Sequence, residues 1–121
     1  MSASILIVED ERIIALDLRG KLVKLGHEVA GLAHTGGEAV QLAVELSPDL
    51  VLMDIILSGG MDGIEAARRI REHREIPVVF VSACNDPLTK ERANQAGCFG
   101  IVSKPVDSLE LAERIREALA G

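Results

Sequence analysis

Aromatic residues are nearly absent from this chain of 121 residues, which has two phenylalanines, no tryptophan and no tyrosine. Any hydrophobic core must therefore consist of aliphatic side chains, and a hydrophobic fraction of 48% supplies enough of them for one domain. The sequence shows no low-complexity segment, internal repeat or linker. We therefore expect a single domain that spans residues 1–121.

Cysteines and long hydrophobic runs are also scarce. The two cysteines, Cys84 and Cys98, are too few for a disulfide framework and do not form a CxxC pair. We interpret both as reduced, partly buried small hydrophobic residues. The first apolar run, Ile5–Val8, is too short for a signal peptide or a membrane span, and no basic segment precedes it. These features favour a cytoplasmic protein.

Positive charge is in deficit, with a formal net charge of −6 and a pI of about 5.0. An acidic chain repels nucleic-acid phosphates and anionic lipids, so we expect neither direct nucleic-acid binding nor membrane binding. A multivalent cation or a basic partner fits this charge better. The histidines His27, His34 and His73 lack the spacing of a zinc site, and we interpret them as surface or turn residues.

Short apolar runs alternate with amphipathic stretches along the whole chain. Runs rich in β-branched residues predict buried parallel strands, at Ile5–Val8, Val29–Ala33, Leu50–Met53, Val78–Val81 and Phe99–Val102. Gly31 interrupts the second run, which suits an edge strand. Helical periodicity predicts helices between them, at Glu11–Leu25, at Ala39–Leu46, around Ile64, Ala67 and Ile70, at Pro87–Ala96, and around Leu111, Ile115 and Leu119.

Helix-capping residues precede four of these helices, namely Thr35 with Glu38, Asp62 with Glu65, Asp86 before Pro87, and Asp107 with Glu110. The strand–helix unit thus occurs five times with short connections. This order predicts an α/β fold of three layers, a doubly wound (βα)5 arrangement with a five-stranded parallel sheet between helices. The helix at Pro87–Ala96 offers only Leu88, Ala93 and Ala96 for burial, so we expect it to be loosely held.

Polar residues follow the predicted strands at the carboxyl ends, where doubly wound sheets bind ligands. They are Glu9 and Asp10, Asp54, Ser82 and Ala83, and Lys104. Three clustered carboxylates repel one another, and a hard divalent cation such as Mg²⁺ relieves that repulsion. With a lysine and a hydroxyl nearby, the set favours phosphoryl transfer to an aspartate.

Five motifs, in order and over essentially the whole chain, resemble a response-regulator receiver domain of the chemotaxis-regulator type. They are Leu6-Ile7-Val8-Glu9-Asp10-Glu11, Val51-Leu52-Met53-Asp54, Met61-Asp62-Gly63, Val81-Ser82-Ala83 and Lys104-Pro105. Each motif alone is weak, but five in register are specific. The resemblance implies a flavodoxin-like fold with strand order 2-1-3-4-5.

The resemblance also implies a role for each matching residue. Asp54 corresponds to the phosphoacceptor, Asp10 to a direct Mg²⁺ ligand, and Glu9 to an acidic neighbour that acts through water. The backbone carbonyl of Ile56 corresponds to the third protein ligand.

Four further positions match the part of the motif that holds the phosphoryl group. Ser82 corresponds to the hydroxyl that moves toward the phosphoryl group, beside the backbone N–H of Ala83. Lys104 corresponds to the lysine that pairs with the phosphate, and its bond to Pro105 is cis in this family.

The resemblance implies signalling partners rather than an external substrate. A histidine kinase or phosphotransfer protein would donate the phosphoryl group, and a downstream protein or an output domain, on another chain or on the same longer chain, would read the change. The reading surface in the family consists of the fourth helix, fifth strand and fifth helix, through which relatives also form homodimers. The domain is then not an enzyme in the usual sense, since it catalyses only its own phosphoryl transfer and dephosphorylation.

The chain departs from the family pattern in three places. The loop after Asp54 is one residue longer than is common and contains Ser58-Gly59-Gly60. Ile101 stands where an aromatic switch residue is often found, so the usual ring movement cannot operate. Neither Ile56 nor Cys84 can orient an attacking water well, and we hypothesise that Asp54 loses its phosphoryl group slowly.

Two other functions compete with the phosphorelay switch. One is a phosphate-independent interaction module with the shape of a receiver domain, which the isoleucine at position 101 favours and the complete set of site residues opposes. The other is an aspartyl-phosphate phosphatase of the haloacid dehalogenase type. That family places a second aspartate two residues after the nucleophile, and here the position is Ile56.

Overall fold

The computed structural model describes residues 2–83 and 86–120 and contains five strands and five helices in strict alternation. The elements are β1 (Ser4–Val8), α1 (Arg12–Lys24), β2 (Glu28–Ala33), α2 (Gly36–Leu46), β3 (Leu50–Asp54), α3 (Gly63–His73), β4 (Val78–Ser82), α4 (Pro87–Gln95), β5 (Gly100–Ser103) and α5 (Ser108–Ala120). Every predicted element is confirmed. The largest shift is in α2, which begins at Gly36 rather than Ala39 because Thr35 is its N-cap.

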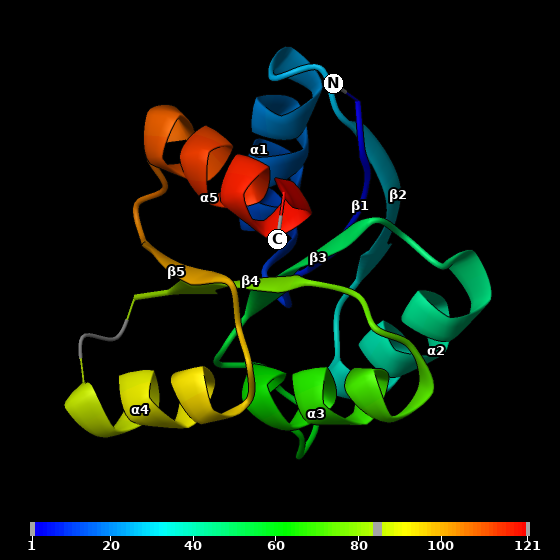
Figure 1. Ribbon diagram of the computed structural model, residues 1–121, viewed down its shortest axis with the longest axis vertical. Helices are drawn as coiled ribbons and strands as arrows, with labels where there is room; N and C mark the ends of the chain where they lie inside the picture. Colours follow the sequence, from blue (N-terminus) through cyan, green and yellow to red (C-terminus); the bar gives the residue numbers. More distant parts are fainter. Residues whose placement is uncertain (1, 84–85, 121) are drawn as a thin grey trace.

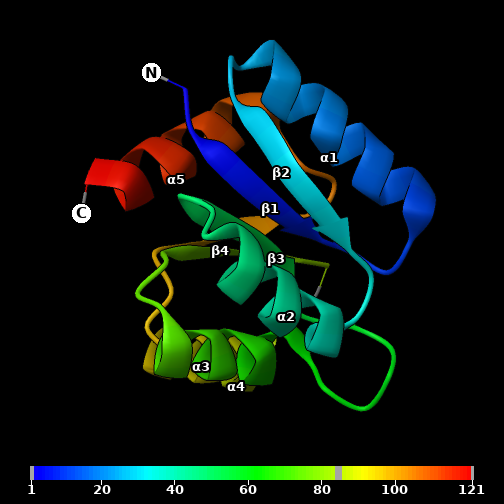
Figure 2. The same ribbon diagram turned by 90° about the vertical axis from the view of Figure 1, so that its right-hand side faces the viewer.

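All strand pairs are parallel, and the sheet order is β2-β1-β3-β4-β5. The ribbon views show three layers, with α1 and α5 on one face of the sheet and α2, α3 and α4 on the other (Figures 1 and 2). The predicted doubly wound topology is therefore confirmed, and β2, with its interrupting glycine, is an edge strand as expected.

The core consists of two aliphatic layers, one on each side of the sheet, because successive strand residues point to opposite faces. In β1, Ile5 and Ile7 pack on the side of α1 and α5, whereas Leu6 and Val8 pack on the side of α2 and α3. All residues of β3 and β4 are buried, which explains why both segments are uniformly apolar until their last residue. That pattern leaves Asp54 and Ser82 as polar groups at the edge of a dry core.

The predicted helix caps are confirmed, with one difference in detail. Asp62 accepts a hydrogen bond from the Glu65 N–H at 2.8 Å, and Thr35 Oγ1 accepts one from the Glu38 N–H at 3.1 Å. The Glu38 carboxylate, however, reaches back past the N-cap to the N–H of His34, at 3.0 Å. The first turn of α2 therefore anchors the residue that directly follows β2.

Two polar contacts near the C-terminal end of α4 connect it to the N-cap and the last turn of α3. Arg92 forms an ion pair with Asp62 at 2.9 Å, and Arg71 Nη1 donates to the Ala96 carbonyl oxygen at 2.7 Å. The expectation that Leu88 is buried is wrong, since its side chain is 69% exposed. Leu88 lies in the first turn of α4, which extends outward at the β5 edge of the sheet (Figure 1), so no core lies beneath it.

Several other sequence expectations fall on single residues. Cys98 is a free, half-buried thiol, and Cys84 lies outside the described residues. His73 is exposed, as expected. His27 and His34 lie in the connections before and after β2, in agreement with the turn interpretation, and both are half-buried and hydrogen-bonded to backbone groups of the β1 region. Within the described ranges, no helix is long and apolar enough to cross a membrane.

Candidate functional site

The candidate site lies where β1, β3, β4 and β5 end side by side. Asp54 and Ser82 are the last residues of β3 and β4, Glu9 directly follows β1, and Lys104 directly follows β5. Because these strands are parallel neighbours, four segments far apart in the sequence deliver their polar residues to one edge.

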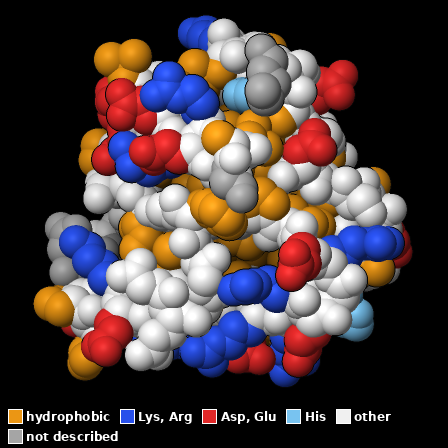
Figure 3. Space-filling view, viewed as in Figure 1, with side chains coloured by type: hydrophobic (Ala, Val, Ile, Leu, Met, Phe, Trp, Pro, Cys, Tyr) orange, Lys and Arg blue, Asp and Glu red, His pale blue; other side chains and the backbone are white. Residues whose placement is uncertain are grey.

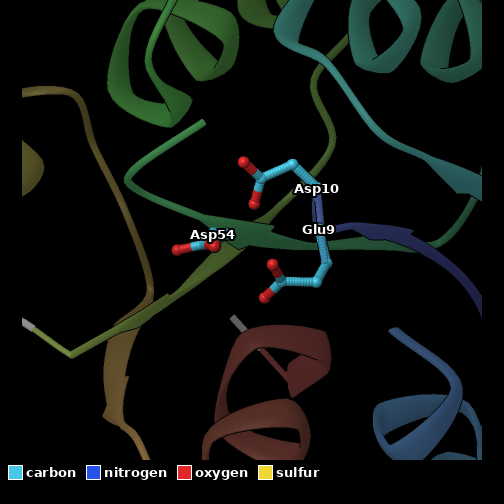
Figure 4. Close-up of side chains that lie close together, drawn as sticks. All are labelled: Glu9, Asp10 and Asp54. Carbon is cyan, nitrogen blue, oxygen red and sulfur yellow. The ribbon is translucent and has the colours of Figure 1, made fainter. Parts of the chain in front are cut away.

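Three carboxylates converge at this edge. The ligand atoms of Glu9, Asp10 and Asp54 all lie within 4.8 Å of one another. Figure 4 shows the Glu9 and Asp10 side chains extending from the end of β1 toward the side of Asp54. Glu9 has no exposed surface and Asp54 is 5% exposed, whereas Asp10 is partly accessible. The cluster predicted from the sequence is therefore present, and most of its charge is shielded from bulk water.

The Lys104 ammonium bridges two of these carboxylates. Its Nζ lies 2.9 Å from Glu9 Oε1 and 3.1 Å from Asp54 Oδ2. Glu9 Oε2 accepts a further hydrogen bond from the Glu11 N–H at 3.0 Å. One ammonium facing three carboxylates leaves uncompensated negative charge at the site.

This charge balance shows in the ionisation of the site. Burial raises the pKa of Asp54 to about 6, and the nearby Glu9 charge acts in the same direction, while Lys104 opposes it. Burial alone would lower the pKa of Lys104, but its hydrogen bonds and its attraction to Glu9 and Asp54 outweigh that effect and raise the pKa. At neutral pH the site therefore holds a charged lysine beside an aspartate whose ionised form is disfavoured by burial and by the charge of Glu9.

The residues present fit a hard divalent cation. Carboxylate oxygens are the ligands that Mg²⁺ prefers, and a partly open site lets the ion keep several waters. The half-accessible Asp10 provides that opening. Ile56 lies just beyond Asp54, where its N–H donates to Asp54 Oδ1 at 3.3 Å and its side chain is 63% exposed. A cation here would relieve the repulsion from Glu9, which adds to the effect of burial on the pKa of Asp54.

The remaining predicted residues lie on the β4–β5 side of the site. Ser82 is buried at the end of β4, and its carbonyl accepts a hydrogen bond from the Lys104 N–H at 2.9 Å. Ala83 follows as the exposed first residue of the next loop. The peptide bond between Lys104 and Pro105 is cis, which confirms the expectation from the resemblance.

The sequence did not reveal two contacts of the site. One is the ion pair between Glu9 and Lys104. The other is the hydrogen bond between His34 Nδ1 and the Glu9 carbonyl oxygen, at 3.1 Å. A signal for His34 did exist, because it directly follows β2 just as Glu9 and Lys104 directly follow their own strands.

The enlarged loop after Asp54 packs against the start of α2. A Cβ built on Gly36 would lie 3.0 Å from the Met61 thioether, so Met61 closely covers this glycine. Gly59 has a φ of +94°, and a Cβ built on it would lie 3.7 Å from the Thr35 methyl group. The positive φ explains why the loop contains glycine there.

The opposite end of the sheet has a different character. A cavity of about 620 Å³ lies at the amino ends of the strands and is lined by residues that include Ala3, Ile76, Phe99 and Leu119. Figure 3 views this end and shows hydrophobic side chains in the middle of the face with charged ones around them. None of the carboxylates of the candidate site lines this cavity.

Comparisons with known proteins agree with this architecture. Residues 5–116 match the family model described as the response regulator receiver domain. The phyllosphere-induced regulator PhyR of Methylorubrum extorquens is 39% identical over 98% of this chain. This chain spans only 44% of the length of that relative.

Solved structures show the same similarity. The signal receiver domain of a modulated diguanylate cyclase from Desulfovibrio desulfuricans superposes with a TM-score of 0.92 at 38% identity, covering 99% of this chain and 95% of that one. A variant of the anti-anti-sigma factor PhyR from Bartonella quintana gives a TM-score of 0.83 at 32% identity, covering 99% of this chain and 49% of that one. From the family match, these similarities and the fold itself, we conclude that this chain belongs to the response regulator receiver domain family.

Proposed function

We propose that this domain is a Mg²⁺-dependent phosphorelay switch that accepts a phosphoryl group on Asp54. The observation that carries the proposal is the position of the Asp54 carboxylate, at the end of a central strand, bound to Lys104 and within 4.8 Å of two further carboxylates. Such a site can hold a nucleophilic oxygen and counter-charges for a phosphoryl group in one place.

The chemistry follows from the groups present. An Asp54 oxygen attacks phosphorus, the bond between phosphorus and the donor nitrogen of a phosphohistidine breaks, and the histidine nitrogen takes up a proton. The Lys104 ammonium, already 3.1 Å from Asp54 Oδ2, neutralises charge on the phosphoryl oxygens, and the Ser82 hydroxyl steadies one of them beside the Ala83 N–H. Mg²⁺, held by Asp10, Asp54 and the Ile56 carbonyl with Glu9 acting through water, would supply further neutralisation.

We also propose the partners that this chemistry requires. A histidine kinase or phosphotransfer protein of the cytoplasm donates the phosphoryl group, and a downstream protein or an attached output domain reads the surface formed by α4, β5 and α5. The same surface is the candidate for a homodimer. One relative is named an anti-anti-sigma factor, which supports an output through protein–protein contact. The net charge of −6 agrees with that output.

The domain then turns over no external substrate and catalyses only its own phosphorylation and dephosphorylation. The phosphatase alternative needs an acid or base two residues after Asp54, and the exposed Ile56 side chain provides neither. A phosphate-independent module would not need the buried Glu9–Lys104–Asp54 arrangement, whose assembly costs desolvation energy.

The test is incubation with acetyl phosphate, with and without Mg²⁺, followed by measurement of the intact mass. We expect a Mg²⁺-dependent gain of one phosphoryl group that is absent in Asp54→Asn. Circular dichroism of both proteins checks that they are folded. A folded parent protein that gains no mass would contradict the proposal and favour the phosphate-independent module.

A further inference from the structure

We propose that His34 is a positioning residue for the acidic site, which it orients through the peptide bond between Glu9 and Asp10. Nδ1 of His34 lies 3.1 Å from the Glu9 carbonyl oxygen. A carbonyl oxygen can only accept a hydrogen bond, so the imidazole must carry its proton on Nδ1 and donate it. This contact links the end of β2 to the first acidic residue after β1.

The imidazole acts where the β1–β2 ladder stops. The last backbone bond of this ladder runs from the Glu9 N–H to the Ala33 carbonyl oxygen, at 3.0 Å. In a continued parallel pair the next bond would run from the backbone N–H of Thr35, two residues after Ala33 and beyond the end of β2, to the Glu9 carbonyl oxygen. Among residues 2–83 and 86–120 the donor to that carbonyl is instead the His34 side chain. The His34 side chain therefore replaces one backbone hydrogen bond between the strands and fixes the chain one residue beyond the end of β1.

The peptide that His34 holds determines where Asp10 points. The Glu9 carbonyl and the Asp10 N–H belong to one rigid plane, so a rotation of that plane moves the Asp10 α-carbon and redirects its side chain. The Glu9 carboxylate has its own anchors in Lys104 and the Glu11 N–H, at 2.9 and 3.0 Å. In the described part of the chain, by contrast, no hydrogen bond or ion pair holds the Asp10 carboxylate. Its direction is therefore set by the backbone position and by side-chain rotation, without a polar anchor of its own.

His34 is itself fixed from the other side. Its N–H donates to Glu38 Oε1 at 3.0 Å, and the Glu38 N–H donates to the Thr35 hydroxyl at 3.1 Å. The first turn of α2 thus holds His34, and His34 holds the Glu9–Asp10 peptide. Outer-shell partners of this kind orient metal ligands and contribute strongly to metal affinity.

This inference rests on the proposed function, because it assigns His34 to the cation site of the same acidic cluster. Its test is the dissociation constant of Mg²⁺, measured by titrating MgCl2 into ¹⁵N-labelled protein and following backbone amide shifts. His34→Ala removes the donor and is expected to weaken Mg²⁺ binding about tenfold. His34→Asn should recover most of the loss, because its amide nitrogen is the same number of bonds from the backbone as Nδ1.

The chain offers a matched control in His27, at the other end of β2. It is also half-buried, and its Nδ1 accepts a hydrogen bond from the Ala3 N–H at 3.1 Å, far from the carboxylates. His27→Ala should loosen the same pair of strands without changing Mg²⁺ affinity. Urea unfolding of each variant verifies that all of them are folded under the titration conditions.

The outcomes separate this inference from the proposed function. If His34→Ala binds Mg²⁺ as the parent does, or if His27→Ala weakens binding equally, the role of His34 is refuted while phosphorylation of Asp54 stands. If the parent binds Mg²⁺ and only the His34→Ala variant loses affinity, but acetyl phosphate adds no mass, His34 keeps its role and the phosphorelay proposal falls. If the parent itself binds no Mg²⁺, both are refuted.

Discussion

Replacing Gly63 with alanine tests how closely α3 must approach the phosphoacceptor strand. Gly63 is the first residue of α3 and is buried against the end of β3. An added Cβ would collide with the carbonyl oxygen of Asp54, and it would lie 2.9 Å from Met53 Cγ and 3.0 Å from the Asp54 carbonyl carbon. A side chain could rotate away, but the backbone of β3 cannot, so helix and strand must separate.

The expected cost follows from this contact. Overpacking a core typically costs about 1–3 kcal/mol, and a clash with backbone belongs at the upper end of that range. Alanine recovers up to about 1 kcal/mol through its better helix propensity, which leaves a net loss of about 2 kcal/mol. For a chain of 121 residues this corresponds to a fall in the melting temperature of about 8 °C.

The assay is urea unfolding, with thermal unfolding as a second probe, on Gly63→Ala and on a matched control. Gly20 is an exposed residue in the middle of α1, and apart from its chain neighbours and the backbone of its own helix no atom lies within 4 Å of the position where its Cβ would be. Gly20→Ala should therefore stabilise the protein by about 0.5–1 kcal/mol, opposite in sign to Gly63→Ala. A Gly63→Ala variant that unfolds at the same urea concentration as the parent would refute the reasoning.

Three further predictions concern the site and α4. Because burial raises the pKa of Asp54 to about 6, the folded state binds more protons than the unfolded state between pH 4 and pH 6, and stability falls across that window as pH rises. At pH 7 without Mg²⁺, urea unfolding of Asp54→Asn should give a free energy of unfolding about 1 kcal/mol higher than that of the parent, after solvent screening. At pH 4 the variant should show no such gain, and an equal gain at both pH values would contradict this origin. Arg92→Ala removes the ion pair with Asp62 and should speed hydrogen exchange in α4 while costing less than about 1 kcal/mol of overall stability, with Arg68→Ala as the control that leaves α4 unchanged. If the apolar Ile56 side chain slows hydrolysis of the phosphorylated domain, the Ile56→Asn variant should lose its phosphoryl group faster than the parent in a time course of intact mass. An unchanged rate would contradict that explanation.

The sequence predicted the fold well because the signals for it are local. Apolar runs without alternation indicate strands buried on both faces, and this is how β3 and β4 are placed. Capping residues such as Asp62 and Asp107 mark helix starts through bonds that span only three residues. Strict alternation of strands and helices then leaves few topologies, and the observed order is the one that the family resemblance implies.

The composition of the candidate site was also predictable, for a related reason. Parallel strands share one carboxyl edge, so a polar residue at the end of each apolar run is carried to the same place. The sequence alone was therefore enough to group Asp54, Ser82 and Lys104. Their roles in phosphoryl transfer remain predictions, because grouping shows proximity and not reactivity.

Only the tertiary structure decided which charges meet and how deeply they lie. Lys104 and Glu9 are separated by 95 positions in the sequence, yet their side chains lie 2.9 Å apart because β1 and β5 end at the same edge of the sheet and both side chains reach toward Asp54. The same holds for Leu88, whose apolar character suggested burial although its helix turn extends past the core, and for His34, whose ring replaces a backbone rung. Periodicity and capping are written in the sequence because they act over a few residues. Burial, ion pairing and the resulting shift in the pKa of Asp54 depend on distances between distant segments, which exist only once the sheet has formed.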